Sequence, residues 1–159
     1  MNITIRHATE ADFPAAFDLV KELAVFQGVP ERILNTVDQM REEKQYFNCL
    51  VAENEQQEVV GIATYFFAYF TWFGKSLYLD DLYVKPSARG QKIGSELLSA
   101  IVDIAKKENC KRVRWLVSAW NKPAIEFYKK CGVEIDHESL VCDLDGEALK
   151  NFDHRFIMD

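Results

Sequence analysis

Hydrophobic spacing in the first part of the chain predicts one strand followed by two helices. Apolar and polar residues alternate over Asn2–His7, which is the pattern of a half-buried strand. Apolar residues then recur at helical spacing from the N-cap candidate Thr9 to a stop near Gly28. Charged residues divide the next apolar positions into a stripe, which predicts a second helix over about Glu31–Glu43.

The middle of the chain has the pattern of an antiparallel meander. The polar run Glu53–Glu58 is a hairpin loop candidate, and the long apolar run that follows is rich in β-branched and aromatic residues. The predicted strands are Cys49–Ala52, Val59–Phe70 and Leu77–Val84.

Helical spacing returns after residue 92. The predicted elements are a helix over Ile93–Glu108, a strand over Lys111–Val117, a helix over Ala124–Lys130, strands over Val133–Ile135 and Leu140–Leu144, and a terminal helix over Glu147–Phe152. A meander followed by alternating strands and helices predicts an α/β (α+β) fold with one mixed, mostly antiparallel central sheet and helices on both faces. Residues 1–159 are expected to form a single domain.

Composition narrows the class of protein. The chain is 48% hydrophobic and 28% charged, which is typical of a folded globular domain. Its net charge of −6 disfavours nucleic acid as a main partner, because binding to phosphate backbones gains from basic surfaces. No apolar run is long enough to suggest a membrane span, and the N-terminus lacks a signal-peptide pattern, so a cytoplasmic location is expected.

Cysteine and histidine spacing gives little support to metal binding or disulfides. The four cysteines lie far apart with no paired spacing, so we expect buried or idle thiols. The three histidines show no ligand spacing either.

The strongest local signal is a basic, glycine-containing loop between the strand ending at Val84 and the following helix. A strand, a tight loop and a helix start aim free backbone N–H groups at one point, which suits phosphate. The sequence matches neither the P-loop nor the dinucleotide fingerprint, and an ordinary helix start is the alternative. The candidate phosphate-binding residues are Arg89, Gly90, Gln91, Lys92, Ile93, Gly94 and Ser95.

This loop, together with a second motif, resembles the GNAT superfamily of N-acetyltransferases. Arg89 and Gly94 fill the ends of that superfamily's acyl-CoA loop, and Lys92 stands where its middle glycine is usual. Trp120–Gly132 looks like its Asn-x-x-Ala-x-x-Phe-Tyr-x-x-x-Gly segment. The likeness is closest to the diamine (spermidine/spermine) and thialysine acetyltransferases. It implies acetyl-CoA as cosubstrate and direct attack by a primary amine of a small cationic substrate in a ternary complex.

The resemblance also assigns catalytic roles. It makes Tyr128 the acid that protonates the departing thiolate, and the alternative is a tyrosine packed on a helix face. Asp80 stands where the related diamine enzymes carry a glutamate, so it is the candidate base, acting through a water. The alternative is a solvated or substrate-binding carboxylate. Asp81 should point to the opposite sheet face if the strand is regular.

The same resemblance supplies the remaining cofactor residues. Backbone groups of Leu82, Tyr83 and Val84 are expected to pair with pantetheine and to polarise the thioester carbonyl. Asn121 is expected to bond the arm of CoA. Lys129 is a candidate for the 3′-phosphate, with a solvated helix face as the alternative.

The acceptor is less sharply specified. Diamine enzymes typically carry a Tyr-Glu pair after the first helix, where this chain has Phe26-Gln27, so polyamine is doubtful. A lysine-like amine, thialysine or another small primary amine fits the acidic candidates, among them Asp80 and Asp81. The rival classes are an acetyl-CoA sensor or scaffold and a peptide or protein N-acetyltransferase. Because related diamine enzymes are homodimers, a homodimer is expected.

Overall fold

The computed structural model describes residues 2–153. The chain divides into two compact units, Met1–Leu116 and Val117–Asp159, and each unit is described by itself.

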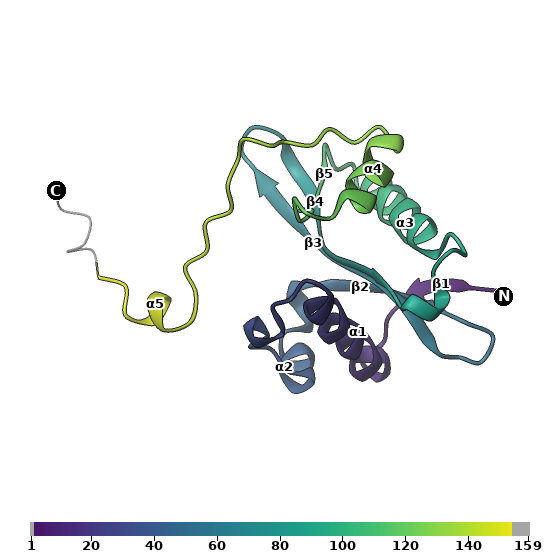
Figure 1. Ribbon diagram of the computed structural model, residues 1–159. Coiled ribbons are helices and arrows are strands. Elements are labelled where there is room, and N and C mark those ends of the chain that lie inside the picture. Colours follow the sequence, from purple (N-terminus) through teal and green to yellow (C-terminus); the bar gives the residue numbers. More distant parts are fainter. Residues whose placement is uncertain (1, 154–159) are drawn as a thin grey trace. The chain divides into compact units, whose positions relative to one another are not determined.

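The N-terminal unit is built on one five-stranded sheet in which the strands lie side by side in chain order (Figure 1). The strands are β1 (Thr4–His7), β2 (Asn48–Glu53), β3 (Val59–Phe70), β4 (Gly74–Val84) and β5 (Val113–Arg114). All neighbours are antiparallel except β4 and β5, which are parallel. The predicted mixed, mostly antiparallel sheet is therefore confirmed.

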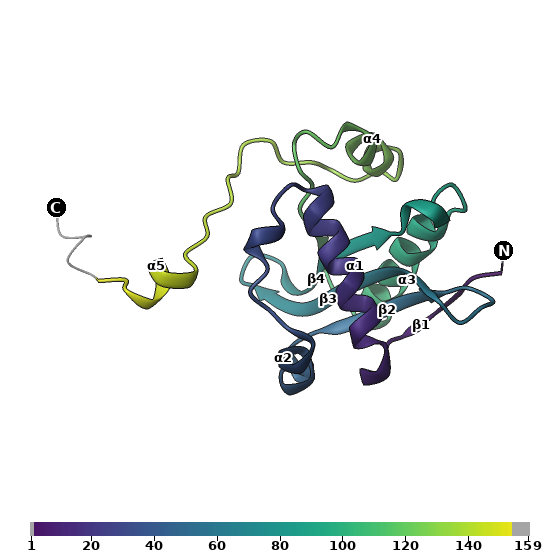
Figure 2. The same ribbon diagram turned by 60° about the horizontal axis from the view of Figure 1, so that its bottom comes forward.

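Two long helices cover opposite faces of this sheet (Figures 1 and 2). On one face α1 (Phe13–Phe26) buries Ala16 and Leu19 against apolar residues of β2 and β3. On the other face α3 (Ile93–Lys107) packs so closely that a Cβ on Gly61 of β3 would stand 3.2 Å from the side chain of Leu97. Burying both faces explains why β3 has a continuous apolar run from Val59 to Ala63.

The second predicted helix is broken into two pieces. Pro30–Arg32 forms a single 3₁₀ turn, and α2 covers only Val37–Glu42. Thr36 separates them, because its hydroxyl accepts a hydrogen bond of 3.1 Å from the N–H of Gln39 and so begins a new helix. The predicted span over Glu31–Glu43 was wrong in its continuity, since the capping residue lies inside the apolar stripe.

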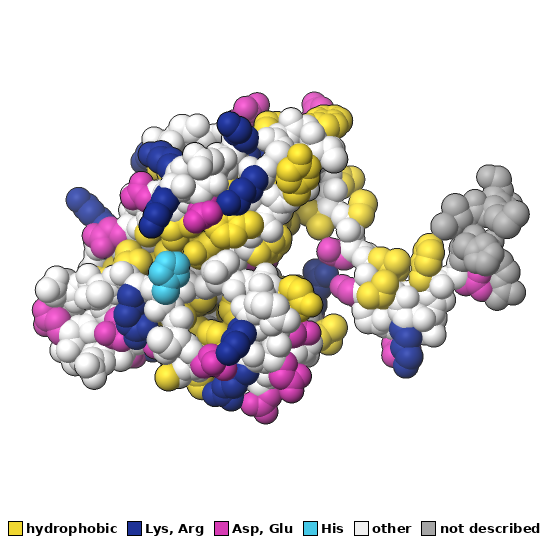
Figure 3. Space-filling model, turned by 180° about the vertical axis from the view of Figure 1, so that it is seen from behind, with side chains coloured by type: hydrophobic (Ala, Val, Ile, Leu, Met, Phe, Trp, Pro, Cys, Tyr) yellow, Lys and Arg dark blue, Asp and Glu magenta, His cyan; other side chains and the backbone are white. Residues whose placement is uncertain are grey.

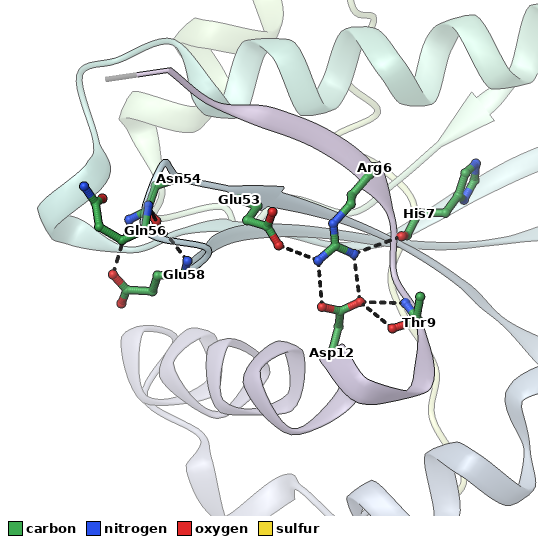
Figure 4. Close-up of polar contacts among 8 residues, drawn as sticks. All are labelled: Arg6, His7, Thr9, Asp12, Glu53, Asn54, Gln56 and Glu58. Carbon is green, nitrogen blue, oxygen red and sulfur yellow. Dashed lines mark hydrogen bonds and ion pairs between the residues drawn. The ribbon is translucent and has the colours of Figure 1, made fainter.

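A partly buried network of ion pairs joins β1 and β2 to the start of α1 (Figure 4). The Arg6 guanidinium donates to both carboxylate oxygens of Asp12, at 2.8 and 2.9 Å, and to Glu53 at 2.5 Å. Asp12 also accepts from the N–H of Thr9 at 2.7 Å, as expected for a helix N-terminus opened by Thr9. These donors hold the pKa of Asp12 well below its usual range, with the Arg6 hydrogen bond as the largest cause.

The C-terminal unit contains two helices, α4 (Lys122–Lys130) and α5 (Gly146–Lys150). The strands predicted over Val133–Ile135 and Leu140–Leu144 are absent from its described residues, and β5 is far shorter than the predicted Lys111–Val117. A strand requires a neighbouring backbone to pair with, and an alternating pattern alone does not supply one. Hydrophobic side chains of this unit consequently stay exposed, and those around α5 are visible in Figure 3.

Two further features of the described chain bear on its class. None of its described helices is both long and apolar enough to span a membrane. The four cysteines are free thiols, and burial raises the pKa of Cys49 to about 12.

Replacing Asp12 by Asn should lower the free energy of unfolding at pH 7 by about 1–2 kcal/mol, because Arg6 loses a two-point carboxylate partner in a partly exposed site. The folded-state pKa of Asp12 lies below its unfolded value of about 3.9, so this stabilisation is present above that pH and is lost as the pH falls. Urea unfolding of both proteins at pH 7 and pH 3 measures the difference, which should shrink at pH 3.

The matched control is Asp18→Asn. Asp18 pairs with Lys21 on the exposed side of α1, so its replacement should cost less than about 0.5 kcal/mol at either pH. An Asp12→Asn effect that is equally large at both pH values would contradict the proposed charge dependence.

Candidate active site

A β-bulge in β4 sets the position of the two predicted acceptor-side carboxylates. Tyr65 of β3 pairs with Leu79, and the next β3 residue, Thr64, pairs with Asp81. Asp80 is therefore an extra residue with no partner in the ladder. The strand is not regular here, so the expected strict alternation of Asp80 and Asp81 between opposite faces does not apply.

Asp81 lies on the face of the sheet that α1 covers. It is two residues before Tyr83 and pairs with Thr64, which in turn pairs with Cys49, and both Tyr83 and Cys49 belong to the core cluster under α1. The Thr64 hydroxyl donates to Oδ2 of Asp81 at 2.7 Å and accepts from the N–H of Asp81 at 3.1 Å. Sequence reasoning missed Thr64, whose only signal was a hydroxyl inside an apolar strand.

The environment raises the pKa of both carboxyl groups. Burial is the largest cause for Asp81, followed by the charge of Asp80, and together they raise its pKa to about 6 against the opposing Thr64 hydrogen bond. Asp80 is an exposed residue, yet the surrounding protein atoms displace enough water from its carboxyl group to raise the pKa of that group as well. A pair of carboxyl groups that titrate closer to neutrality suits proton transfer and cation binding.

The backbone beyond the bulge has a free edge. β5 pairs with β4 only at Leu77 and Tyr78, so Leu82, Tyr83 and Val84 pair with β3 alone among the strands that the structure describes. The side chain of Tyr83 is buried and its hydroxyl donates to Glu22 of α1 at 3.3 Å. The N–H and C=O groups on the open side of these residues are the kind that pair with an extended ligand.

The predicted phosphate loop follows directly and folds back on the strand. After a 3₁₀ turn over Pro86–Ala88, the Nε–H of Arg89 donates to the carbonyl of Val84 at 3.0 Å. Its guanidinium lies 5.6 Å from the ring centre of Phe26 and 5.4 Å from that of Tyr83. Arg89 thus joins the loop to the C-terminal end of α1 through cation–π contacts, which the sequence did not reveal.

Two residues in the loop adopt left-handed backbone. Gly90 has a φ of +81° and Lys92, the N-cap position of α3, has a φ of +64°. Gly94, by contrast, is already inside α3 without a positive φ, and a Cβ there would meet only ordinary contacts. Lys92 stands where related loops usually carry glycine, and its φ gives the physical reason for that preference.

The start of α3 presents its first N–H groups out of this turn. Ile93 is buried and anchors the helix, whereas Gln91 and Ser95 are exposed. The first backbone bond onto the cap runs from Glu96 N–H to the carbonyl of Lys92 at 3.0 Å, so the N–H groups before it have no partner within the helix. The N-terminus of a helix, here preceded by the basic residues Arg89 and Lys92, favours a phosphate at that end.

The candidate substrate residues Phe26 and Gln27 end α1. Gln27 is the C-cap, its N–H bonds to the carbonyl of Leu23 at 2.9 Å, and both side chains are exposed. Arg89 brings Phe26 to the loop, so a residue predicted to contact substrate lies within the N-terminal unit beside one predicted to contact cofactor.

The second motif forms α4 of the C-terminal unit, with a matched cap at each end. Oδ1 of Asn121 accepts from the N–H of Ala124 at 3.3 Å, which leaves its amide N–H₂ as donor for a ligand. Gly132 has a φ of +79°, its N–H bonds to Lys129 O at 3.0 Å, and Val133 N–H bonds to Tyr128 O at 3.1 Å. This is a Schellman ending, so Asn121 and Gly132 have structural roles in addition to any contact with a ligand.

Tyr128 and Lys129 on α4 differ in their burial and in the contacts of their side chains. Tyr128 is half-buried, with its ring centre 5.4 Å from that of Phe127. Lys129 is exposed and pairs with Glu126 at 3.6 Å, which is compatible with either a phosphate contact or a solvated helix face.

Two hollows of the N-terminal unit are lined by residues other than the predicted site residues. The larger, of about 390 Å³, is lined by Asp12, Asp18, Glu22, Glu58 and Lys85 among others, and the smaller lies beside His7 and Phe47. Neither includes Asp80, Asp81 or the loop, which instead use a strand edge and a helix end. No cluster of three or more His, Cys, Asp or Glu suited to a metal ion occurs in residues 2–153.

Comparison with known proteins identifies relatives over most of the chain. Residues 10–133 match the acetyltransferase (GNAT) family. The chain is 35% identical to a thialysine N-epsilon-acetyltransferase of Bos taurus, over 93% of this chain and 95% of that protein. It is 38% identical to spermidine/spermine N(1)-acetyltransferase-like protein 1 of Homo sapiens, over 80% of this chain and 20% of that longer protein.

Solved structures share the fold. A predicted acetyltransferase from Clostridium acetobutylicum, whose crystal structure is with acetyl-CoA, superimposes with a TM-score of 0.73 and 22% identity. The match covers 90% of this chain and 97% of that one.

Replacing Lys92 by Gly should raise the free energy of unfolding by up to about 1 kcal/mol, because glycine adopts φ of +64° without the clash that an L side chain meets. Gln91→Gly is the matched control in the same loop. Its φ is outside the left-handed region, so the added backbone freedom should lower stability by about 0.4–1 kcal/mol. Urea unfolding measures both variants, and equal losses in the two would contradict strain at Lys92.

Proposed function

We infer the function from one premise: the chain belongs to the acetyltransferase (GNAT) family, and is an acyltransferase with acetyl-CoA as its cosubstrate. We propose that it transfers the acetyl group to the primary amine of a small cationic substrate. The observation that carries this proposal is the pair of carboxyl groups at the β4 bulge, directly before a free strand edge and a basic helix start.

The carboxyl groups supply what the acceptor needs. Asp80 has no hydrogen-bond or ion-pair partner within residues 2–153, and Oδ1 of Asp81 has none there either. An alkylammonium with a pKa near 10.4 is attracted to such a pair and must lose a proton before its nitrogen can attack. We propose that Asp80 accepts this proton through a water and that Asp81 holds the cation.

The transfer itself needs no covalent enzyme intermediate. The amine nitrogen forms a bond to the acetyl carbonyl carbon while the carbon–sulfur bond breaks, in a complex that contains both substrates. The amine proton goes to Asp80, and the departing thiolate takes a proton from the hydroxyl of Tyr128. A backbone N–H of Leu82 or Tyr83 polarises the carbonyl as negative charge develops on its oxygen.

The cofactor site combines the strand edge with the helix start. We propose that Leu82, Tyr83 and Val84 pair with the pantetheine arm. The phosphates then lie against Arg89, Gly90, Gln91, Lys92, Ile93, Gly94 and Ser95. The free amide of Asn121 bonds the arm, and Lys129 is the candidate partner of the 3′-phosphate.

The acceptor class follows from both charge and relatives. Thialysine N-epsilon-acetyltransferases match the chain almost end to end, so a lysine-like side-chain amine heads the list, ahead of diamines and polyamines. Phe26 and Gln27 provide an aromatic and an amide contact but no further carboxylate. That composition favours an acceptor with a single essential cationic end.

We also propose that both units form one acetyltransferase domain, because the family match runs across their boundary at residue 116. The cytoplasmic location predicted from the sequence stays a prediction.

A second copy of this chain is the proposed partner. Large apolar side chains stay exposed at the β3–β4 hairpin, among them Tyr69 at 78% and Trp72 at 93%. Sedimentation velocity should give the mass of a dimer, and Trp72→Ser should shift the protein toward monomer. Tyr46→Ser, at a residue that is 71% exposed but outside the hairpin, should not. A wild-type monomer would contradict the homodimer.

The proposed function is tested with a panel of amines at fixed acetyl-CoA. Lysine, thialysine, ornithine, a diamine, spermidine and a peptide with a free N-terminus are compared by kcat/KM. We expect turnover of small cationic amines, led by the lysine-like ones, and little of the peptide. Preference for the peptide would support a peptide N-acetyltransferase instead, and tight acetyl-CoA binding without turnover would support a sensor.

Tyr128→Phe separates chemistry from binding in the same assay. Losing the phenolic proton should lower kcat by about 10²–10⁴-fold and leave acetyl-CoA affinity nearly unchanged. A wild-type rate in this variant would remove Tyr128 from the mechanism while leaving the acceptor class untouched.

A further inference from the structure

At the bulge, the polar side chain of Thr64 on β3 contacts Asp81, the proposed cation-binding carboxylate. Thr64 is 7% exposed and is paired on one side with Cys49 and on the other with Asp81. Its hydroxyl makes two hydrogen bonds to the same residue, donating to the carboxylate and accepting from the backbone N–H. This double contact fixes both the main chain and the side chain of Asp81 at the point where the ladder is interrupted.

A hydroxyl can donate only one hydrogen bond, and Thr64 donates its bond to Oδ2 of Asp81 at 2.7 Å. Oδ1 is the oxygen that remains without a partner in the described part of the chain. An acceptor ammonium therefore meets a carboxylate with one oxygen held by the protein and the other available. Valine in place of threonine would fill the same space without holding either group.

We propose that Thr64 is a positioning residue of the acceptor site, which orients Asp81 so that its second oxygen binds the substrate ammonium. This inference rests on the proposed function, and it adds a residue outside the catalytic and cofactor motifs.

The charges around Asp81 decide the direction of the effect. Asp80 and Tyr83 face it from its own strand, Cys49 from β2, and Glu22 is the charged group that α1 brings to Tyr83. Burial and the negative charge of Asp80 both favour the protonated form of Asp81, and the Thr64 hydroxyl opposes them. Removing the hydroxyl should therefore raise the pKa of Asp81 from about 6, toward the neutral range.

Two readouts test the role of Thr64 in the full chain. Carbon-detected NMR titration of the aspartate carboxyl groups follows Asp81 without substrate, with Asp81→Asn identifying its signal. Thr64→Val should move its midpoint up by about one pH unit, and the acid limb of kcat/KM should move with it. At pH values below both midpoints this equals about a tenfold loss of kcat/KM, which recovers as the pH rises.

Matched variants separate positioning from packing. Thr64→Ser keeps the hydroxyl and should restore both the midpoint and the pH profile, although it leaves a small void. Thr71→Val removes a hydroxyl from the exposed turn after β3 and should change neither. If Thr64→Val does not fold, Thr64→Ala carries the same test.

The possible failures are distinguishable. An unchanged Asp81 midpoint and acid limb in an active Thr64→Val enzyme would overturn the role of Thr64 alone. A shifted midpoint in a protein that acetylates no amine of the panel would overturn the proposed function, and with it any part for Thr64 in acceptor binding.

Discussion

The long antiparallel pairing of β3 with β4 is the constraint on which the rest of the structure depends. It runs from Gly61 opposite Val84 to Phe70 opposite Gly74, and helices cover both faces at its Gly61–Val84 end. Because successive side chains point to opposite faces, a slip of one residue would turn every side chain of the strand to the wrong face. The register is therefore fixed. The position along the sheet at which β4 ends and the loop after Val84 begins is fixed with it.

Within that fixed register, a single extra residue produces the acidic centre. If β4 were regular, one carboxylate would face α1 and its neighbour would face α3. The insertion of Asp80 between the pairs of Leu79 and Asp81 breaks this alternation, and the negative charge of Asp80 helps to raise the pKa of Asp81. Asp80 has no partner in the ladder, and the pKa values of both carboxyl groups are raised. Both properties are useful for binding a cation and accepting its proton.

An acidic segment and a basic segment follow each other closely along the chain. The bulge in β4 is acidic, whereas the loop after Val84 offers Arg89, Lys92 and the free N–H groups of α3. Arg89 is held by a strand carbonyl and two aromatic rings, so its charge is positioned before any ligand binds. The proposed amine site on this strand thus comes directly before the proposed phosphate site in the turn that follows it.

Local pattern predicted the parts of the fold that depend on neighbouring residues. The helical spacing predicted α1 and α3, the apolar run predicted β3, and the glycine and basic residues after Val84 predicted a loop that leads into α3. The spacing from Asn121 to Gly132 predicted α4, because an N-cap and a C′ glycine act within a few residues of the helix they bound. The break before α2 was missed although its cause, the cap at Thr36, is local.

Tertiary structure decided the features that depend on contacts between residues far apart in the sequence. The sequence contains both aspartates, yet the bulge that leaves Asp80 without a ladder partner exists only because β3 imposes a register on β4. Thr64 and the contact between Arg89 and Phe26 were invisible for the same reason, since each joins residues far apart in the chain. The mostly apolar segment 140–144 makes the same point from the other side: the sequence alone sets which residues are apolar, but whether they form a strand depends on the backbone available to pair with them.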